Sequence, residues 1–391
     1  NVDDNTAPQV AGSLTPLAIE GCSASAAPAA VTTVAALEAL AGNLTVTDAC
    51  TPDASLTITS SDAAAGTCPI VIIRTYTLRD ACGNSSNVIH TINIDDNTAP
   101  VVAGTLTATT VEGCGVASAP PAVTTVAALE ALAGGVTITD ACTPDISLVV
   151  TSSDVSSGTC PIVITRTYTV TDACGNSVNV IHTIRVNDTQ PPVVSGSLNL
   201  QNVEGCNASN APAPVSTVAA LEALPGSLAI SDLCSSDAAM TVTSSDVSSG
   251  TCPVVVTRTY TVRDACGNSV NIIQTINVDD NTPPVVTGAL LPSNIEGCSA
   301  AAAPVPLTTV AALEALPGGM TISDACTADA ALVVASSTVT SGTCPVVLTR
   351  TYTITDACGN SVTLVHTINI DDTQAPVVTG LLAPVNIEGC T

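Results

Sequence analysis

The stretch CPIVITRTYTVTDACGNSVNVIHTIRV, residues 160–186, carries the longest β-strand pattern in the chain. Its two halves, 160–172 and 177–186, are rich in β-branched residues and alternate in polarity, as half-buried strands do. The four residues between them, 173–176, include a Gly and an Asn, either of which can adopt a positive φ. The stretch therefore predicts a β-hairpin with ACGN as its turn.

This hairpin belongs to a unit that recurs throughout the chain. Cys22, Cys114, Cys206, Cys298 and Cys390 are each 92 residues apart, and three further sets of cysteines keep the same spacing. A period of this length exceeds that of most helical solenoids and matches a small β-sandwich. The segment TTVAALEALAGG interrupts the β pattern once per repeat and predicts a short helical turn. We expect an all-β chain of tandem immunoglobulin-like β-sandwich repeats, stacked as a rod.

Short linkers that contain proline separate the repeats and are too short to act as flexible tethers. No export signal and no apolar run of membrane-spanning length is present, so we expect a segment of a longer protein. The predicted domains are repeat 1 at 1–96, repeat 2 at 97–188, repeat 3 at 189–280, repeat 4 at 281–372 and the start of a fifth repeat at 373–391.

The composition excludes several classes of function. The formal net charge is −26 and there is no Lys, which argues against nucleic acids and anionic membranes as partners. Divalent cations are the obvious counter-ions. Only three His are present and no Ser-His-Asp set recurs, so we expect no enzymatic activity.

Four cysteines in each repeat of a soluble acidic chain indicate an oxidising compartment and disulfides, since their spacing does not suit zinc. The third cysteine opens the long strand and the fourth closes it, so these two cannot meet. The second and fourth both end a TDAC or equivalent segment and are expected to share one end of the sandwich. An alternative, in which neighbouring repeats are bridged by pairs such as Cys82–Cys114, stays open. The predicted disulfides are Cys22–Cys68, Cys50–Cys82, Cys114–Cys160, Cys142–Cys174, Cys206–Cys252, Cys234–Cys266, Cys298–Cys344 and Cys326–Cys358.

Acidic residues of the linkers are expected to form a cation site. In a sandwich, the linker that enters a domain lies at the same end as two of its loops. Carboxylate and amide oxygens gathered there suit Ca²⁺, although the same Asp residues would also cap the backbone N–H groups of turns. At the third repeat Asn187 and Asp188 replace the Asp pair, which removes one charge. The predicted ligands are Asp95, Asp96, Asn97, Asp140 and Asp172 at one linker and Asp279, Asp280, Asp324 and Asp356 at another.

The segment RTYTVTDACGNSVNVIHTIRVNDTQPP, residues 166–192, resembles the end of a hyalin-repeat (HYR-like) domain, an immunoglobulin-like module. The matching positions are Tyr168, Asp172, Gly175, Asn176, Asp188 and Pro191. The fuller repeat pattern is similar to the tandem repeats of very large surface adhesins of gliding Bacteroidota, which are exported by type IX secretion and form filaments. HYR-like domains often carry a Cys in the last strand, which is absent here, so their disulfide pattern does not transfer.

These features together predict an extracellular protein of a bacterial cell surface. We expect a structural stalk that extends a distal adhesive part from the cell, in gliding motility as the resemblance implies. Its partners would be further copies of the same repeat in a longer chain. Two alternatives stay open: multivalent binding of surface polysaccharide by the repeats themselves, and lateral packing into a fibre of several chains. No cofactor other than Ca²⁺ is expected.

Overall fold

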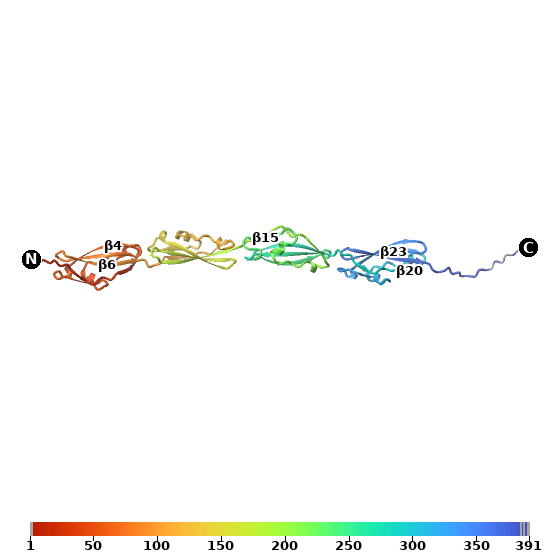
Figure 1. The fold of residues 1–391 in the computed structure, drawn as a ribbon, viewed down its shortest axis with the longest axis horizontal. Helices are drawn as coiled ribbons and strands as arrows, with labels where there is room; N and C mark the ends of the chain where they lie inside the picture. Colours follow the sequence, from red (N-terminus) through yellow and green to blue (C-terminus); the bar gives the residue numbers. More distant parts are fainter. Residues whose placement is uncertain (1–2, 384, 386–387, 389–391) are drawn as a thin grey trace. The chain divides into compact units, whose positions relative to one another are not determined.

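The computed structural model describes residues 3–383, 385 and 388 of the 391-residue chain. It confirms the all-β tandem sandwich fold, with long strands such as β4 (Thr57–Ala65) and β6 (Ser85–Asp95) running along the first repeat (Figure 1). The chain divides into two compact units, Asn1–Gln190 and Pro191–Thr391, each of which contains two successive copies of the same element order.

The second repeat illustrates the element order shared by all four. The elements of the second repeat are β7 (Val101–Ala103), β8 (Thr109–Glu112), α2 (Val126–Glu130), β9 (Thr137–Thr139), β10 (Val149–Ser157), β11 (Ile162–Thr171) and β12 (Ser177–Asn187). The first repeat adds to β4 and β6 the elements β1 (Gln9–Ala11), β2 (Leu17–Glu20), α1 (Val34–Glu38), β3 (Thr45–Thr47) and β5 (Ile70–Arg79). The third contains β13 (Val193–Ser195), β14 (Gln201–Glu204), α3 (Val218–Glu222), β15 (Ala229–Ser231), β16 (Thr241–Ser249), β17 (Val254–Arg263) and β18 (Ser269–Asp279). The fourth contains β19 (Val285–Thr287), β20 (Ser293–Glu296), α4 (Val310–Glu314), β21 (Thr321–Ser323), β22 (Val333–Ser341), β23 (Val346–Thr355) and β24 (Ser361–Asp371).

Each repeat contains a four-stranded and a two-stranded sheet. In the second repeat the larger sheet has the order β10-β11-β12-β8, in which only the β8–β12 pair is parallel, and the smaller sheet pairs β7 with β9. The parallel pair places Glu112, at the end of β8, opposite Asn187, at the end of β12. Both strands therefore end at the side of the repeat where the chain leaves it.

A single tyrosine anchors the main core of each repeat. Tyr168 on β11 is 1% exposed and packs with Leu129 of α2, Ile138 of β9 and Val170. Its hydroxyl accepts a hydrogen bond from the backbone N–H of Val123 at 3.4 Å. The helical turn α2 begins at a Thr cap and buries two side chains, as its apolar spacing predicts.

The ACGN turn joins β11 to β12 as the sequence predicts. Gly175 has a φ of +97°, a value that a residue with a Cβ adopts only with strain. Asp172 begins the turn, and its Oδ1 accepts hydrogen bonds from the backbone N–H groups of Cys174 and Asn176, both at 2.8 Å. The turn is thus held by its own aspartate.

Candidate functional site at the junction between repeats

Two disulfides join the first repeat to the second. Cys22 bonds to Cys142 and Cys68 bonds to Cys174, with Cα–Cα distances of 4.8 and 5.3 Å that suit a disulfide. The partners are 120 and 106 residues apart in sequence, so each bond crosses from one repeat into the next. The second unit repeats this arrangement with Cys206–Cys326 and Cys252–Cys358.

Six of the eight predicted pairings within one repeat are therefore wrong. The prediction that the second and fourth cysteines share one end of the sandwich is confirmed. The backbone N–H of Ala173 donates to Thr143 Oγ1 at 3.2 Å, so the loops that carry these cysteines are in contact. At the opposite end, Gly21 N donates to the backbone carbonyl of Asp95 at 3.1 Å, and Cys68 Sγ lies 3.5 Å from a carboxylate oxygen of Asp95. Each end turns its cysteines towards the neighbouring repeat. The pairs that the structure contradicts are Cys22–Cys68, Cys50–Cys82, Cys142–Cys174, Cys206–Cys252, Cys298–Cys344 and Cys326–Cys358.

The remaining cysteines fall into two groups. Cys114, Cys160, Cys234 and Cys266 are all in disulfides. The predicted Cys114–Cys160 and Cys234–Cys266 pairs therefore stay predictions. The free thiols Cys50, Cys82, Cys298 and Cys344 are exposed. Cys390, expected to open a fifth repeat, lies outside the described residues.

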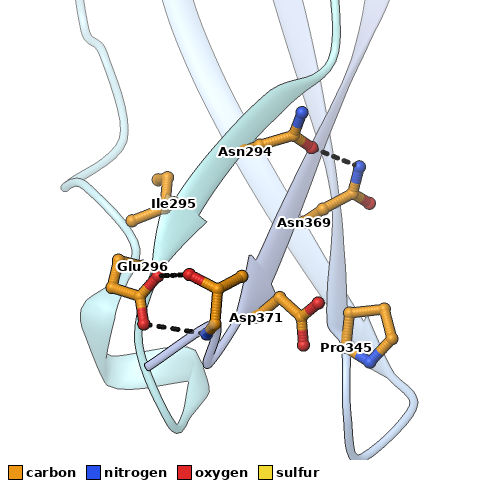
Figure 2. Close-up of a pocket in the computed structure, with 7 residues that line it drawn as sticks. Asn294, Ile295, Glu296, Pro345, Asn369 and Asp371 are labelled. Carbon is orange, nitrogen blue, oxygen red and sulfur yellow. Dashed lines mark hydrogen bonds between the residues drawn. The ribbon is translucent and has the colours of Figure 1, made fainter. Parts of the chain in front are cut away.

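A glutamate fixes the chain where it leaves each repeat. The carboxylate of Glu20 accepts hydrogen bonds from the backbone N–H and the side-chain amide of Asn97, at 3.1 and 3.0 Å. At the end of the fourth repeat the equivalent is Glu296, which is labelled in Figure 2. Its carboxylate accepts from the backbone N–H of Thr373 at 3.0 Å and from the Thr373 hydroxyl. The sequence signal was the Glu of the recurring EGC segment, which sequence reasoning missed.

The same end of the fourth repeat has a shallow hollow of about 470 Å³ between β20, β24 and Pro345 (Figure 2). Asn369 Nδ2 donates to Asn294 Oδ1 at 2.9 Å across the parallel strand pair. A matching hollow of about 430 Å³ lies in the first repeat beside Pro69, Asp95 and Asn97. Since Cys68 and Cys344 each precede the proline of these hollows, the hollows belong to the junction surface.

Three aspartates gather where the linker enters the second repeat. Asp96 of the linker, Asp140 after β9 and Asp172 after β11 each place a carboxylate oxygen within 4.8 Å of the others. Asp96 and Asp172 are only 3% and 4% exposed. Asn176 ties the linker to the turn, because its side-chain amide donates to the Asp96 carbonyl and to Asp172 Oδ2, both at 2.8 Å. We call Asp96, Asp140 and Asp172 the junction triad.

Two of the predicted ligands lie outside the junction triad. Asp95 lies beside the Cys68–Cys174 disulfide, and Asn97 donates to Glu20. Asn187 takes the place of Asp95 at the end of β12, while the neighbouring Asp188 is 4% exposed like Asp96. The loss of charge noted from the sequence therefore affects a position that the triad does not use.

The second unit reproduces the local bonding of the triad at the entry to the fourth repeat. Asn360 donates to the Asp280 carbonyl at 2.7 Å and to Asp356 Oδ2 at 2.8 Å. Asp324 Oδ1 accepts from the backbone N–H of Cys326 at 2.9 Å. Asp279 lies with Cys252 and Cys358 at that unit's disulfide, as Asp95 does in the first unit.

Arg166 and His182 lie opposite each other on β11 and β12 of the larger sheet. Arg166 forms a bidentate ion pair with Asp154, at 2.8 and 2.9 Å, and also donates to the Pro120 carbonyl at 2.8 Å. The hydrogen bonds from Arg166 lower the pKa of Asp154. His182, opposite Arg166 on β12, is 5% exposed, and burial lowers its pKa below the ordinary value of histidine. These groups support the sheet and lie away from the junction.

None of the helices within residues 3–383 is long and apolar enough to cross a membrane. Among solved structures, the extracellular domain of protocadherin GammaB4 is 13% identical, with 95% of this chain and 68% of that chain covered and a TM-score of 0.26. Protocadherin Gamma B2 extracellular cadherin domains 1–5 are 12% identical, with 96% and 82% covered and a TM-score of 0.30. Drosophila N-cadherin EC1–4 is 11% identical, with 77% and 83% covered and a TM-score of 0.24. No curated protein matches the chain.

Two segments, residues 24–94 and 116–186, match the family described as HYR-like domain with 4 cysteines. Each matched range contains three cysteines, and the fourth, Cys22 or Cys114, immediately precedes it. The disulfides found at the junction are those expected of extracellular repeats. Two parts of the chain therefore resemble HYR-like domains, and its disulfides are of the extracellular type.

Proposed function

We propose that the chain is part of a load-bearing stalk in a long secreted filament or adhesin of a bacterial cell surface. In this proposal the repeats hold a distal adhesive part away from the cell and carry the tension that acts on it. Type IX secretion and a role in gliding motility extend the proposal on the strength of the sequence resemblance alone. The proposal includes no enzymatic activity, because no Ser-His-Asp set recurs in the sequence.

The observation that carries this proposal is that, within each unit, a disulfide joins a long strand segment of one repeat to a long strand segment of the next. Cys68 and Cys82 bracket β5, and Cys160 and Cys174 bracket β11. The Cys68–Cys174 disulfide joins these two segments end to end. A covalent path from Cys82 to Cys160 can therefore follow segments 68–82 and 160–174 and the disulfide between them, and it bypasses the whole backbone of residues 83–159.

This covalent path can lengthen very little under force. β5 and β11 are already extended, at about 3.3 Å per residue, and a fully stretched chain reaches only about 3.6 Å per residue. Force applied along a unit is therefore borne by covalent bonds before a repeat can lengthen by unfolding. A module that only displayed binding loops would gain nothing from this arrangement.

Single-molecule pulling of the whole chain tests the proposal. With the disulfides intact, we expect no event that releases a complete repeat. With dithiothreitol, each of the 92-residue repeats should release about 300 Å of chain. Release events of that size in the oxidised chain would contradict a load-bearing role for the disulfides.

Lateral association into a fibre is the second candidate, because β10 forms an open edge of its sheet. This strand is nine residues long, and Val155 on it is 70% exposed. Such an edge can pair with another chain. Electron micrographs of the native assembly would distinguish one chain from several. A glycan array with the whole chain would detect direct binding of polysaccharide, which a pure stalk does not show.

A further inference from the structure

We propose that the junction triad, like the equivalent cluster within the second unit, binds a divalent cation of the Ca²⁺ type, which fixes the linker to the repeat it enters. The proposal deepens the stalk function, because it names the ion that completes the junction. Two independent observations carry it: three carboxylates lie close together, two of them on buried residues, and two buried carboxylate oxygens make no hydrogen bond.

The first observation is uncompensated negative charge. Asp96, Asp140 and Asp172 lie within 4.8 Å of one another, and none of the ion pairs among residues 3–383 reaches them. Like charges this close strongly oppose one another away from bulk water. A buried cluster of carboxylates is stable only when a cation or a proton compensates it.

The second observation is the direction of the unused oxygens. Asp96 Oδ1 accepts from the backbone N–H and the hydroxyl of Thr98, and Asp140 Oδ1 accepts from Cys142 N and Thr143 N. The Oδ2 atoms of both aspartates are buried and make no hydrogen bond. Since one oxygen of each carboxylate is fixed by the backbone, the other is held in place for a ligand.

The ligand chemistry favours a hard cation. All the atoms that could coordinate a metal here are carboxylate oxygens, which Ca²⁺ and Mg²⁺ prefer, whereas zinc favours nitrogen and sulfur. Three carboxylates fill only part of the coordination of six to eight oxygens that Ca²⁺ takes, and water would supply the rest. A site of this kind belongs with extracellular calcium modules, whose dissociation constants are about 0.1–1 mM.

The same arrangement occurs at the entry to the first repeat, where Asp4, Asp48 and Asp80 form the cluster. Asp4 Oδ2 is again buried without a partner, and Asn84 donates to the Asp4 carbonyl at 3.0 Å. The cluster therefore needs only a repeat and the linker that enters it. The cation would lock the linker to the loops that also hold the second and fourth cysteines, beside the disulfides.

The test compares the whole oxidised chain with Asp140→Asn and Asp324→Asn variants. Asparagine keeps the Oδ1 acceptor that holds the turn but removes the charge. The matched control is Asp95→Asn, because Asn187 already occupies that position at the end of the second repeat. Isothermal titration with CaCl₂ measures the number of ions bound, and thermal unfolding is followed in 10 mM Ca²⁺ and in EDTA.

We expect Ca²⁺ to raise the Tm of the wild-type chain by about 5–15 °C. Each triad variant should bind one ion fewer, and Asp95→Asn should bind as many as the wild type. In EDTA, Asp140→Asn should be at least as stable as the wild type, since it relieves repulsion, and this outcome separates loss of the site from loss of the fold. An unchanged number of bound ions in Asp140→Asn, or the same wild-type Tm in Ca²⁺ and EDTA, would overturn the proposal. Full-size repeat unfolding in the oxidised chain would refute the stalk function without affecting this site.

Discussion

The two disulfides of a junction are not equivalent under load, and the second unit allows a direct test. Handles attached without cysteine chemistry at Ser269 and Thr343, both exposed, lie at the far ends of the third and fourth repeats. Through the Cys252–Cys358 bond these points are joined by two short segments, 252–269 and 343–358. Along the backbone they are joined by the much longer segment 269–343.

Replacing Cys252 and Cys358 with Ser removes the shorter of these two paths. The fully stretched chain between the handles should then lengthen by about 150 Å, because the backbone path is longer by roughly 40 residues at about 3.6 Å each. Replacing Cys206 and Cys326 should leave the stretched length unchanged, because the shorter path survives. Optical tweezers at forces that unfold the repeats measure both lengths.

All variants in this experiment carry Ser at the four free cysteines, so that disulfide exchange cannot blur the comparison. The two double variants remove the same number of sulfur atoms and one bond each, which makes them matched controls for one another. Equal lengthening in both, or a wild-type chain that already stretches to the full length of segment 269–343, would refute the idea that one line of strands carries the load.

Three further predictions concern the repeats and their ends. Burial lowers the pKa of His182, so the unfolded chain binds more protons than the folded one and the Tm should fall as the pH drops from about 7 to 5. His182→Gln, which copies Gln274 of the third repeat, should reduce this slope, and an identical slope would contradict the argument. Thr338→Asp should give Arg350 the carboxylate that its equivalents have and raise the free energy of unfolding by about 0.5–1 kcal/mol in urea titrations. With oxidised glutathione as the oxidant, Cys50 and Cys82 of one chain should form disulfides with Cys298 and Cys344 of another. Non-reducing gels should then show a ladder of linked chains. Replacing either pair of thiols with Ser should abolish the ladder.

Local features of the fold could be predicted from the sequence because they depend on short-range chemistry. The turn at Gly175 follows from the need for a positive φ, and α2 follows from its Thr cap and its apolar spacing. The approach of Asp96 to Asp140 and Asp172 also followed, since a linker and two loops at one end of a sandwich must be neighbours.

The disulfide partners could not be predicted for a physical reason. In a chain of near-identical repeats, the second cysteine of one repeat and of the next have the same surroundings in sequence, so spacing cannot separate Cys50 from Cys142 as the partner of Cys22. Cys22 pairs with Cys142 because Cys22 lies where the chain leaves the first repeat, and Cys142 lies where the chain enters the second repeat. That distinction depends on the parallel pairing of β2 with β6, which brings Cys22 to the exit end and carries no local signal.

The segment DACGN, residues 172–176, contributes to the junction through three of its side chains. Asp172 holds the turn and contributes to the triad, Cys174 bonds to the preceding repeat, and Asn176 donates to the carbonyl of the incoming linker. Gly175 supplies the positive φ with which the chain turns between them. Because all of them act on what precedes the repeat, a substitution here should weaken the junction more than the sandwich. This also accounts for the identical spacing of the segment in the four repeats, because Cys174 can bond to Cys68 only when both lie at fixed positions in their repeats.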